Sequence, residues 1–514
     1  MATPDPRFPP TRGTGQRWSI IAGGPALPRW ARAADLLAIA LVVIGVTVSA
    51  SGGFRLRFGE WRFALTSLYR PLLLAAAIAG VRHFFVRDHS IFAHAMTQAR
   101  RWTRSPALRT AGAVSVGSRF AIVLAGLLAV LTFGYPPGAP PWRDYDNELL
   151  NLPLRWDAGW YLQIAENGYS YIPEAGPEVQ QNIVFFPAYP MVTRVVALLL
   201  GNQQGTYVAA GTIVSLAAFL FALAYLYAFA RDEIGDERAS SALWLMAAYP
   251  FAVFFGAIYT ESLYLLAALG ALHHFRRREF IRAGLWGLVI GLTRPNGALL
   301  AIPLALLACA PWLPAAIAGG AAGGGLSHPS QSGLEAPRPG MRCFQASDRL
   351  APAFAAAAAC VFGAVLYSIF IWGMTGSPIA WASGHVAWGR HYTSLAGLVT
   401  TRVGYISHAG LYEYVSRSPY DLLNVLGAVF VLAAVWPVWR RFGIAFAAFI
   451  LVNILPPLTS GGFLSAGRLS AVLFPAFVWL AGAATPRQRD ACIVSFAILQ
   501  ALCAALFYTW RPLF

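Results

Sequence analysis

The stretch YVAAGTIVSLAAFLFALAYLYAFA, residues 207–230, contains no charged side chain and is followed at once by Arg231. As a helix it matches the roughly 30 Å hydrocarbon core of a lipid bilayer. Across the chain, 57% of residues are hydrophobic and only 12% are charged, against about 25% charged residues in soluble domains. The sequence therefore predicts an all-α polytopic membrane protein.

Apolar runs of this kind recur from end to end of the sequence. We expect spans near 33–52, 66–82, 118–135, 207–230, 239–255, 259–275, 297–314, 351–373, 421–439, 442–458, 468–484 and 490–509. A shorter run at 282–293 adds one more, which gives about 12 or 13 transmembrane helices.

The net charge of +16 comes from arginine alone, since the sequence contains no lysine. This bias is typical of a GC-rich genome and favours a bacterial source, hence the bacterial plasma membrane. The arginines cluster beside apolar runs, where the positive-inside rule accounts for them, so we expect no nucleic-acid partner. The cysteines form no CxxC pair and predict neither a disulfide framework nor a zinc site: Cys309, Cys343, Cys360, Cys492 and Cys503.

Arginine placement also predicts the orientation of the chain. The arginine-rich loop 83–117 should be cytoplasmic, which places the acidic segment 136–182 outside. The segment 183–200 either spans the membrane or lies along the outer interface. Only the interfacial alternative keeps most arginine clusters inside, and two prolines and Arg194 disfavour a span.

These patterns divide the chain into four parts. Residues 1–31 are predicted to be a disordered cytoplasmic tail, and 32–312 an N-terminal transmembrane part with a catalytic outer loop at 136–200. The Gly-, Ser- and Pro-rich segment 313–350 reads as a flexible cytoplasmic insert. Residues 351–514 form the C-terminal transmembrane part.

A carboxylate suited to catalysis stands in RWDAGWYLQIAENGY, residues 155–169. Asp157 precedes a short helical pattern with Trp160 and Tyr161 along one side. A carboxylate among aromatic rings suits a general base acting on a sugar hydroxyl. The alternative is that Asp157 only caps the helix that starts at Ala158.

Three arginines on the same predicted face are candidate phosphate ligands, because a guanidinium matches phosphate oxygens in a low-dielectric site. Arg294 precedes the helix-breaking Pro295, Arg468 lies in LSAGRLSAVLFP, and Arg390 lies in AWGRHY. The alternative for Arg294 and Arg468 is a snorkelling side chain that ends a helix.

Other polar residues have more than one interpretation. Glu261 is a candidate for the sugar site, but a glutamate in a first turn also complements the helix dipole. His385 is either a site residue or a solvated loop histidine. Asp144 and Asp146 form a DxD pattern that elsewhere binds a metal, but solvated loop carboxylates are the better interpretation, and we expect no metal site.

Six motifs in order resemble those of PIG-V-type mannosyltransferases, a family of the GT-C superfamily of membrane glycosyltransferases. They are RWDAGWYLQIAENGY, FFPAYPMVTR, AAYPFAVFFGAIYTESLYLL, GLTRPNG, GSPIAWASGHVAWGRHY and SAGRLSAVLFPAF, within about 155–480. The resemblance implies a GT-C-like bundle whose first large outer loop contains interfacial helices and the catalytic aspartate.

Residue by residue, the resemblance makes Asp157 the base and Arg294 and Arg468, with Arg390, ligands of the donor phosphate. It implies that Trp160, Tyr161 and Glu261 line the sugar site, and we add Tyr189 and His385 as further candidates for the sugar or acceptor site. The implied donor is polyprenyl-phosphate mannose, used with inversion and without a separate cofactor. In eukaryotic members the acceptor is a glycosylphosphatidylinositol precursor; here the lipid, glycan or protein acceptor stays open.

Two other classes of function compete with this interpretation. One is a GT-C enzyme that uses another lipid-phosphate sugar, which the sequence does not separate from mannose. The other is a lipid or solute transporter, or a non-catalytic scaffold subunit. Transporters favour internal repeats and mid-helix ionisable groups, whereas the predicted spans here are nearly free of acidic residues and the polar groups gather at one face.

Overall fold

The computed structural model describes residues 28–51, 54–58, 61–65, 69–86, 103–139, 144–176, 178–203, 205–314, 317, 319 and 350–513. Nearly all of the predicted tail (1–31) and insert (313–350) therefore lies outside the described residues, as does much of the loop 83–117. Nothing in the structure bears on these predictions.

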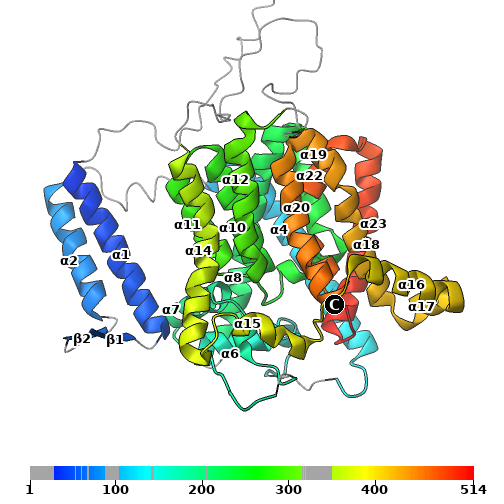
Figure 1. Ribbon diagram of the computed structural model, residues 1–514, viewed down its shortest axis with the longest axis horizontal. Coiled ribbons are helices and arrows are strands. Elements are labelled where there is room, and N and C mark those ends of the chain that lie inside the picture. The colour runs from blue at the N-terminus through cyan, green and yellow to red at the C-terminus, as the bar shows by residue number, and fades with distance from the viewer. Residues whose placement is uncertain are drawn as a thin grey trace, which may run out of the picture.

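Long helices run side by side in a single bundle (Figure 1). Seven helical segments in the described part of the chain are long and apolar enough to cross a bilayer. They are α4 (Pro106–Phe133), α8 (Thr206–Ile234), η4–α12–η5 (Pro295–Trp312), α14 (Ala351–Thr375), α18–α19 (Pro419–Phe442), α20 (Ile444–Gly461) and α23 (Pro486–Tyr508). The predicted class, an all-α polytopic membrane protein, is confirmed.

Several predicted spans are shorter or divided in the structure. The run 239–255 forms α9 (Asp236–Ala247) and then the 3-10 turn η3 (Pro250–Phe255), and 468–484 forms α21 (Ala466–Ser470) and α22 (Phe474–Ala483). A proline stands at the first or second position of η3 and α22, where its missing N–H breaks no helical bond but prevents continuation from the preceding turn. The remaining bundle helices are α10 (Glu261–Arg276) and α11 (Phe280–Gly291).

A helical hairpin stands beside the bundle (Figure 1). It consists of α1 (Arg29–Ser51) and α2 (Tyr69–Phe85), which an ion pair of 2.8 Å between Asp35 and Arg82 ties together. Between them, β1 (Phe54–Phe58) and β2 (Trp61–Leu65) pair antiparallel in a short hairpin that the sequence analysis did not predict. The period-two alternation of FRLRF is a strand pattern.

Arginines gather at one end of the bundle. Arg276, in the last turn of α10, pairs with Glu233 at 2.5 Å. At the same end Arg238 donates to the carbonyl of Gly482 at 3.1 Å, and Arg489 to Ser241 Oγ at 3.4 Å. Under the positive-inside rule this end would be the cytoplasmic one, and the orientation stays a prediction.

Short helices lie toward the opposite end, where Figure 1 shows α6 and α15 beneath the bundle and α16 and α17 projecting to its side. They are α5 (Glu148–Asn151), α6 (Ala158–Asn167), η2 (Asn182–Val184), α7 (Ala188–Leu199), α15 (Ala380–Ser383), η6 (Gly384–Trp388), α16 (Leu395–Ala409) and α17 (Leu411–Arg417). The 12 residues of α7 span only about 18 Å as a helix, too short to cross a bilayer. Its length fits the predicted interfacial segment.

Candidate active site

Asp157 immediately precedes α6, yet its side chain does not cap that helix. Its backbone is helical (φ −65°, ψ −9°) and its carboxylate makes no capping hydrogen bond, whereas N-cap residues have extended backbone. Instead Oδ2 accepts from Nη1 of Arg468 at 3.0 Å. Oδ1 accepts no hydrogen bond from any described residue. The carboxylate is thus turned away from its own helix and toward α21.

The residues before Asp157 hold it in this orientation. Arg155 is fully buried and donates to Tyr508 O at 2.8 Å and to Tyr135 Oη at 2.9 Å. Trp156 has a φ of 55°, a left-handed conformation that is strained for a bulky residue and persists only where surrounding contacts enforce it. The N–H of Asp157 donates to Tyr259 Oη at 2.9 Å.

Glu261, the first residue of α10, is fully buried between two arginines. Its Oε1 accepts from Nη2 of Arg294 and from Nε of Arg468. Buried charges require such partners, because the cost of removing them from water is otherwise uncompensated. Glu261 therefore links Arg294 to Arg468, and through Arg468 to Asp157.

Arg294 has unused hydrogen-bonding capacity. It sits in extended backbone (φ −157°, ψ 157°) before the proline turn η4, and its Nε donates to Thr260 Oγ1 at 2.6 Å. Nη1 is buried and lacks a partner within the described part of the chain, as does Oε2 of Glu261. An unpaired buried guanidinium nitrogen is costly, which marks a position where a ligand oxygen would be favourable.

Aromatic rings form one wall of the site. Trp160 stacks on Phe185, with 5.9 Å between ring centroids, and meets the edge of Trp388 at 5.7 Å. Tyr161 packs edge-on against Tyr189 at 5.4 Å. Half-buried Trp160 is thus placed to contact a ligand. Fully buried Tyr189 uses its hydroxyl internally and supports Tyr161 from behind.

Arg390 approaches the cluster from the loop after η6. Its Nη1 lies 3.0 Å from where a Cβ on Gly461 would stand. Burial and the charge of Arg468 lower the pKa of Arg390, while Asp157 raises it, which places all three within electrostatic reach. The Arg390 guanidinium makes no hydrogen bond to a described residue. His385, on η6, is half-buried near Arg390, and burial lowers its pKa to about 4.

Several residues around the site escaped the sequence analysis. Asn453, on α20, accepts at Oδ1 from Tyr264 Oη and from Asn296 Nδ2, the latter at 2.9 Å. Its side chain thereby ties α20 to α10 and to the turn after Arg294. A lone amide within an apolar run was the available signal, since polar side chains inside spans usually serve a specific contact.

The DxD pattern lies apart from this cluster. Asp144 and Asp146 are exposed, and the backbone N–H of Asp144 donates to Asn151 Oδ1 at 3.1 Å. No described group of three or more His, Cys, Asp or Glu residues has a geometry that would hold a metal ion. Both carboxylates lie at exposed positions of the loop, and the absence of a metal there stays a prediction.

Comparison with known proteins agrees with the first four motifs. Residues 142–307 match the model of the Mannosyltransferase (PIG-V) family. The matched segment contains Asp157, Trp160, Glu261 and Arg294, while Arg390 and Arg468 lie beyond it.

Alignments with individual relatives also cover a limited part of each chain. GPI alpha-1,6-mannosyltransferase 2 of Rattus norvegicus is 29% identical over 172 residues, 32% of this chain and 33% of the relative. The protein of that name from Cricetulus griseus is 31% identical over 157 residues, which are 29% of this chain and 30% of the relative. The alignments thus cover about a third of these relatives' length.

Solved structures show a weaker likeness. An oligosaccharyltransferase of Archaeoglobus fulgidus, solved with zinc and sulfate, aligns with a TM-score of 0.36 and 13% identity over 76% of this chain and 53% of that one. A second structure is the AglB oligosaccharyltransferase of the same organism, in complex with an inhibitory peptide and a dolichol-phosphate. It aligns with a TM-score of 0.36 and 13% identity over 77% of this chain and 56% of that one.

Proposed function

We propose that this protein is a membrane mannosyltransferase that transfers mannose from polyprenyl-phosphate mannose to an acceptor hydroxyl, with inversion at the anomeric carbon. The observation that carries the proposal is the joining of Asp157, Arg468, Glu261 and Arg294 into one ion network at the end of the bundle opposite the arginine clusters. The match to the PIG-V family supports mannose as the sugar.

Asp157 is the proposed general base. Its free Oδ1 takes the proton from the acceptor hydroxyl as that oxygen forms a bond to the anomeric carbon. The bond from this carbon to the phosphate oxygen breaks, and polyprenyl phosphate leaves with the electron pair. Arg468 holds Oδ2 at 3.0 Å and so fixes the direction of the carboxylate.

Charge balance supports Arg390 and Arg294 as ligands of the donor phosphate. The two carboxylates, Asp157 and Glu261, neutralise Arg294 and Arg468, so that Arg390 adds one uncompensated positive charge. A sugar-phosphate diester carries one negative charge, which Arg390 would match. The unpartnered Nη1 of Arg294 offers a second donor in a low-dielectric site.

The proposed active site faces the non-cytoplasmic side, because it lies at the end of the bundle away from the arginine clusters. The lysine-free composition remains the reason to place the protein in a bacterial plasma membrane; the mammalian relatives give that assignment no support. The proposal requires no separate cofactor, and leaves open whether the acceptor is a lipid, a glycan or a protein.

The test follows radiolabelled polyprenyl-phosphate mannose in membranes that contain the protein. Label should move to an acceptor, and Asp157→Asn should reduce transfer by roughly 10²–10⁴-fold, the usual contribution of a general base. Asp146→Asn, in the exposed part of the same loop, is the matched control and should transfer normally. Activity of Asp157→Asn within about twofold of wild type would remove Asp157 as the base. Wild-type protein that consumes only a different lipid-phosphate sugar would change the donor.

A further inference from the structure

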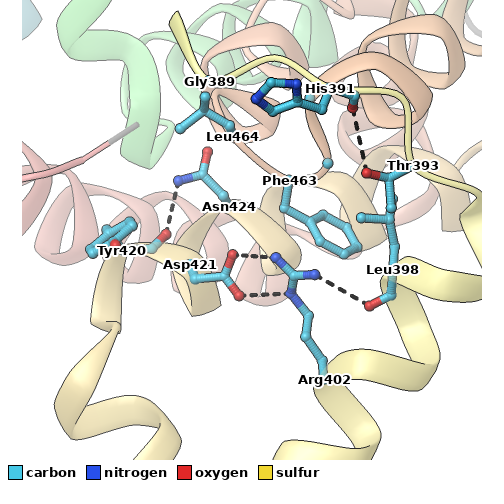
Figure 2. Close-up of a pocket in the computed structure, with 12 residues that line it drawn as sticks. Gly389, His391, Thr393, Leu398, Arg402, Tyr420, Asp421, Asn424, Phe463 and Leu464 are labelled. Carbon is cyan, nitrogen blue, oxygen red and sulfur yellow. Dashed lines mark hydrogen bonds and ion pairs between the residues drawn. The ribbon is translucent and has the colours of Figure 1, made fainter.

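A cavity of about 300 Å³ opens among residues of the C-terminal half of the chain. Figure 2 shows its lining, which comes from the loop after η6, from α16, from the start of α18 and from the turn after α20. Its walls include His391, Thr393, Arg402, Asp421 and Phe463. The whole cavity lies outside residues 142–307, the part of the chain that matches the PIG-V family.

Short connections join this cavity to the proposed catalytic residues. Asn424, on the cavity wall, accepts at Oδ1 from the N–H of Gly467 at 2.8 Å, and Gly467 is adjacent to Arg468. On another wall, Gly389 precedes Arg390, whose guanidinium packs against Gly461. The cavity lining therefore contacts the segment that carries Arg468 and the Arg390 side chain itself.

The polar groups of the cavity suit a neutral hydroxylated ligand. Arg402 forms a two-point ion pair with Asp421, with Nε to Oδ2 at 2.8 Å and Nη2 to Oδ1 at 2.6 Å (Figure 2). Because Asp421 neutralises Arg402, the lining offers no spare positive charge to an anion. The lining does offer Thr393 and His391, whose side chains can each donate and accept hydrogen bonds.

An aromatic surface completes the cavity. Phe463 lies under the guanidinium of Arg402, 4.6 Å from ring centroid to Cζ, and Tyr420 contributes to the lining. Ligand sites of roughly 300–1,000 Å³ combine apolar faces with a few placed polar groups. A volume at the lower end of that range fits a single ring bearing hydroxyl groups better than an extended chain.

We propose that this cavity binds a neutral glycosyl or polyol group of the acceptor and presents one of its hydroxyls toward Asp157. The role as an acceptor site rests on the proposed transfer reaction. The binding of a neutral glycoside does not, so binding and transfer can be measured independently.

The binding experiment uses the full chain in phospholipid nanodiscs, with methyl α-mannoside as the probe, and saturation-transfer NMR as the readout. His391→Trp, at an exposed cavity-lining position, should weaken binding at least tenfold by filling the cavity. Tyr392→Trp is the matched control: Tyr392 is 84% exposed, does not line the cavity, and its variant should bind like wild type. Thr393→Trp repeats the test from a second wall.

Three results would overturn the proposal: no glycoside binding by wild type, equal binding by His391→Trp and Tyr392→Trp, or displacement of the glycoside by inorganic phosphate. A transfer assay separates the two proposals. Loss of transfer in His391→Trp with retained binding of polyprenyl-phosphate mannose supports the acceptor role. A wild-type protein that binds the glycoside in this cavity but consumes no lipid-phosphate sugar refutes the acceptor role and the proposed function, while the binding site itself stands.

Discussion

Replacement of Glu261 by glutamine should destabilise the folded protein by about 3–5 kcal/mol, the usual cost of leaving a buried charge without its partner. Glu261 is fully buried, and its Oε1 accepts from both Arg294 and Arg468. Arg468 would still pair with the Asp157 carboxylate, but Arg294 would lose the carboxylate that neutralises it, because the glutamine amide is uncharged. Glutamine preserves the shape of the side chain, so that charge is the main quantity changed.

The chain offers a matched control at the opposite end of the bundle. Glu279 also pairs with two basic groups, His274 at 2.6 Å and Arg282 at 2.9 Å, but its side chain is 30% exposed. Exposed ion pairs contribute about 0–1 kcal/mol, so Glu279→Gln should change the unfolding free energy by no more than that. The contrast between the two substitutions isolates the effect of burial.

The assay is reversible unfolding in mixed detergent micelles, followed by tryptophan fluorescence and extrapolated to zero denaturant. Glu261→Gln should lower the unfolding free energy several times more than Glu279→Gln. If the two variants lost equal stability, or if Glu261→Gln stayed within about 1 kcal/mol of wild type, the ion network would not stabilise this end of the fold as argued.

Three further outcomes follow from the same contacts. Arg390→Gln should raise the KM for polyprenyl-phosphate mannose about tenfold or more with unchanged unfolding free energy; an unchanged KM in steady-state assays would exclude a phosphate contact. Gly467→Ala should destabilise by about 1–3 kcal/mol, because its Cβ would lie 2.0 Å from Phe251 Cζ, whereas Gly404→Ala, with nothing within 4 Å, should not; equal unfolding curves would contradict this. The pKa of His385 is about 4 in the folded protein and about 6.5 in the unfolded chain. Between these pH values the unfolded chain binds one more proton than the folded protein, so the unfolding free energy decreases as pH falls from about 6.5 to about 4. His385→Gln should remove this loss, and unfolding free energies at pH 7.5 and 5.0 that fall equally in both proteins would refute it.

Much of the bundle could be predicted from hydropathy and proline placement. The predicted runs 207–230 and 351–373 correspond to α8 (Thr206–Ile234) and α14 (Ala351–Thr375). This works because the transfer free energy of a run into a bilayer depends on its own side chains and length. The predicted helix boundaries were less accurate around the site. The run 468–484 is divided between α21, a short helix whose Gly467 packs on Phe251, and α22.

The sequence by itself determined the membrane class, the segregation of arginines to one end, and a set of polar residues that included Asp157, Glu261, Arg294 and Arg468. Only the tertiary structure decided which of them touch. The contact between Asp157 and Arg468 joins positions 311 residues apart, and it turns the Asp157 side chain from a helix cap into part of an ion network. Local pattern predicts where a helix begins, but a pairing of buried charges depends on how distant helices pack, and that packing depends on the whole bundle.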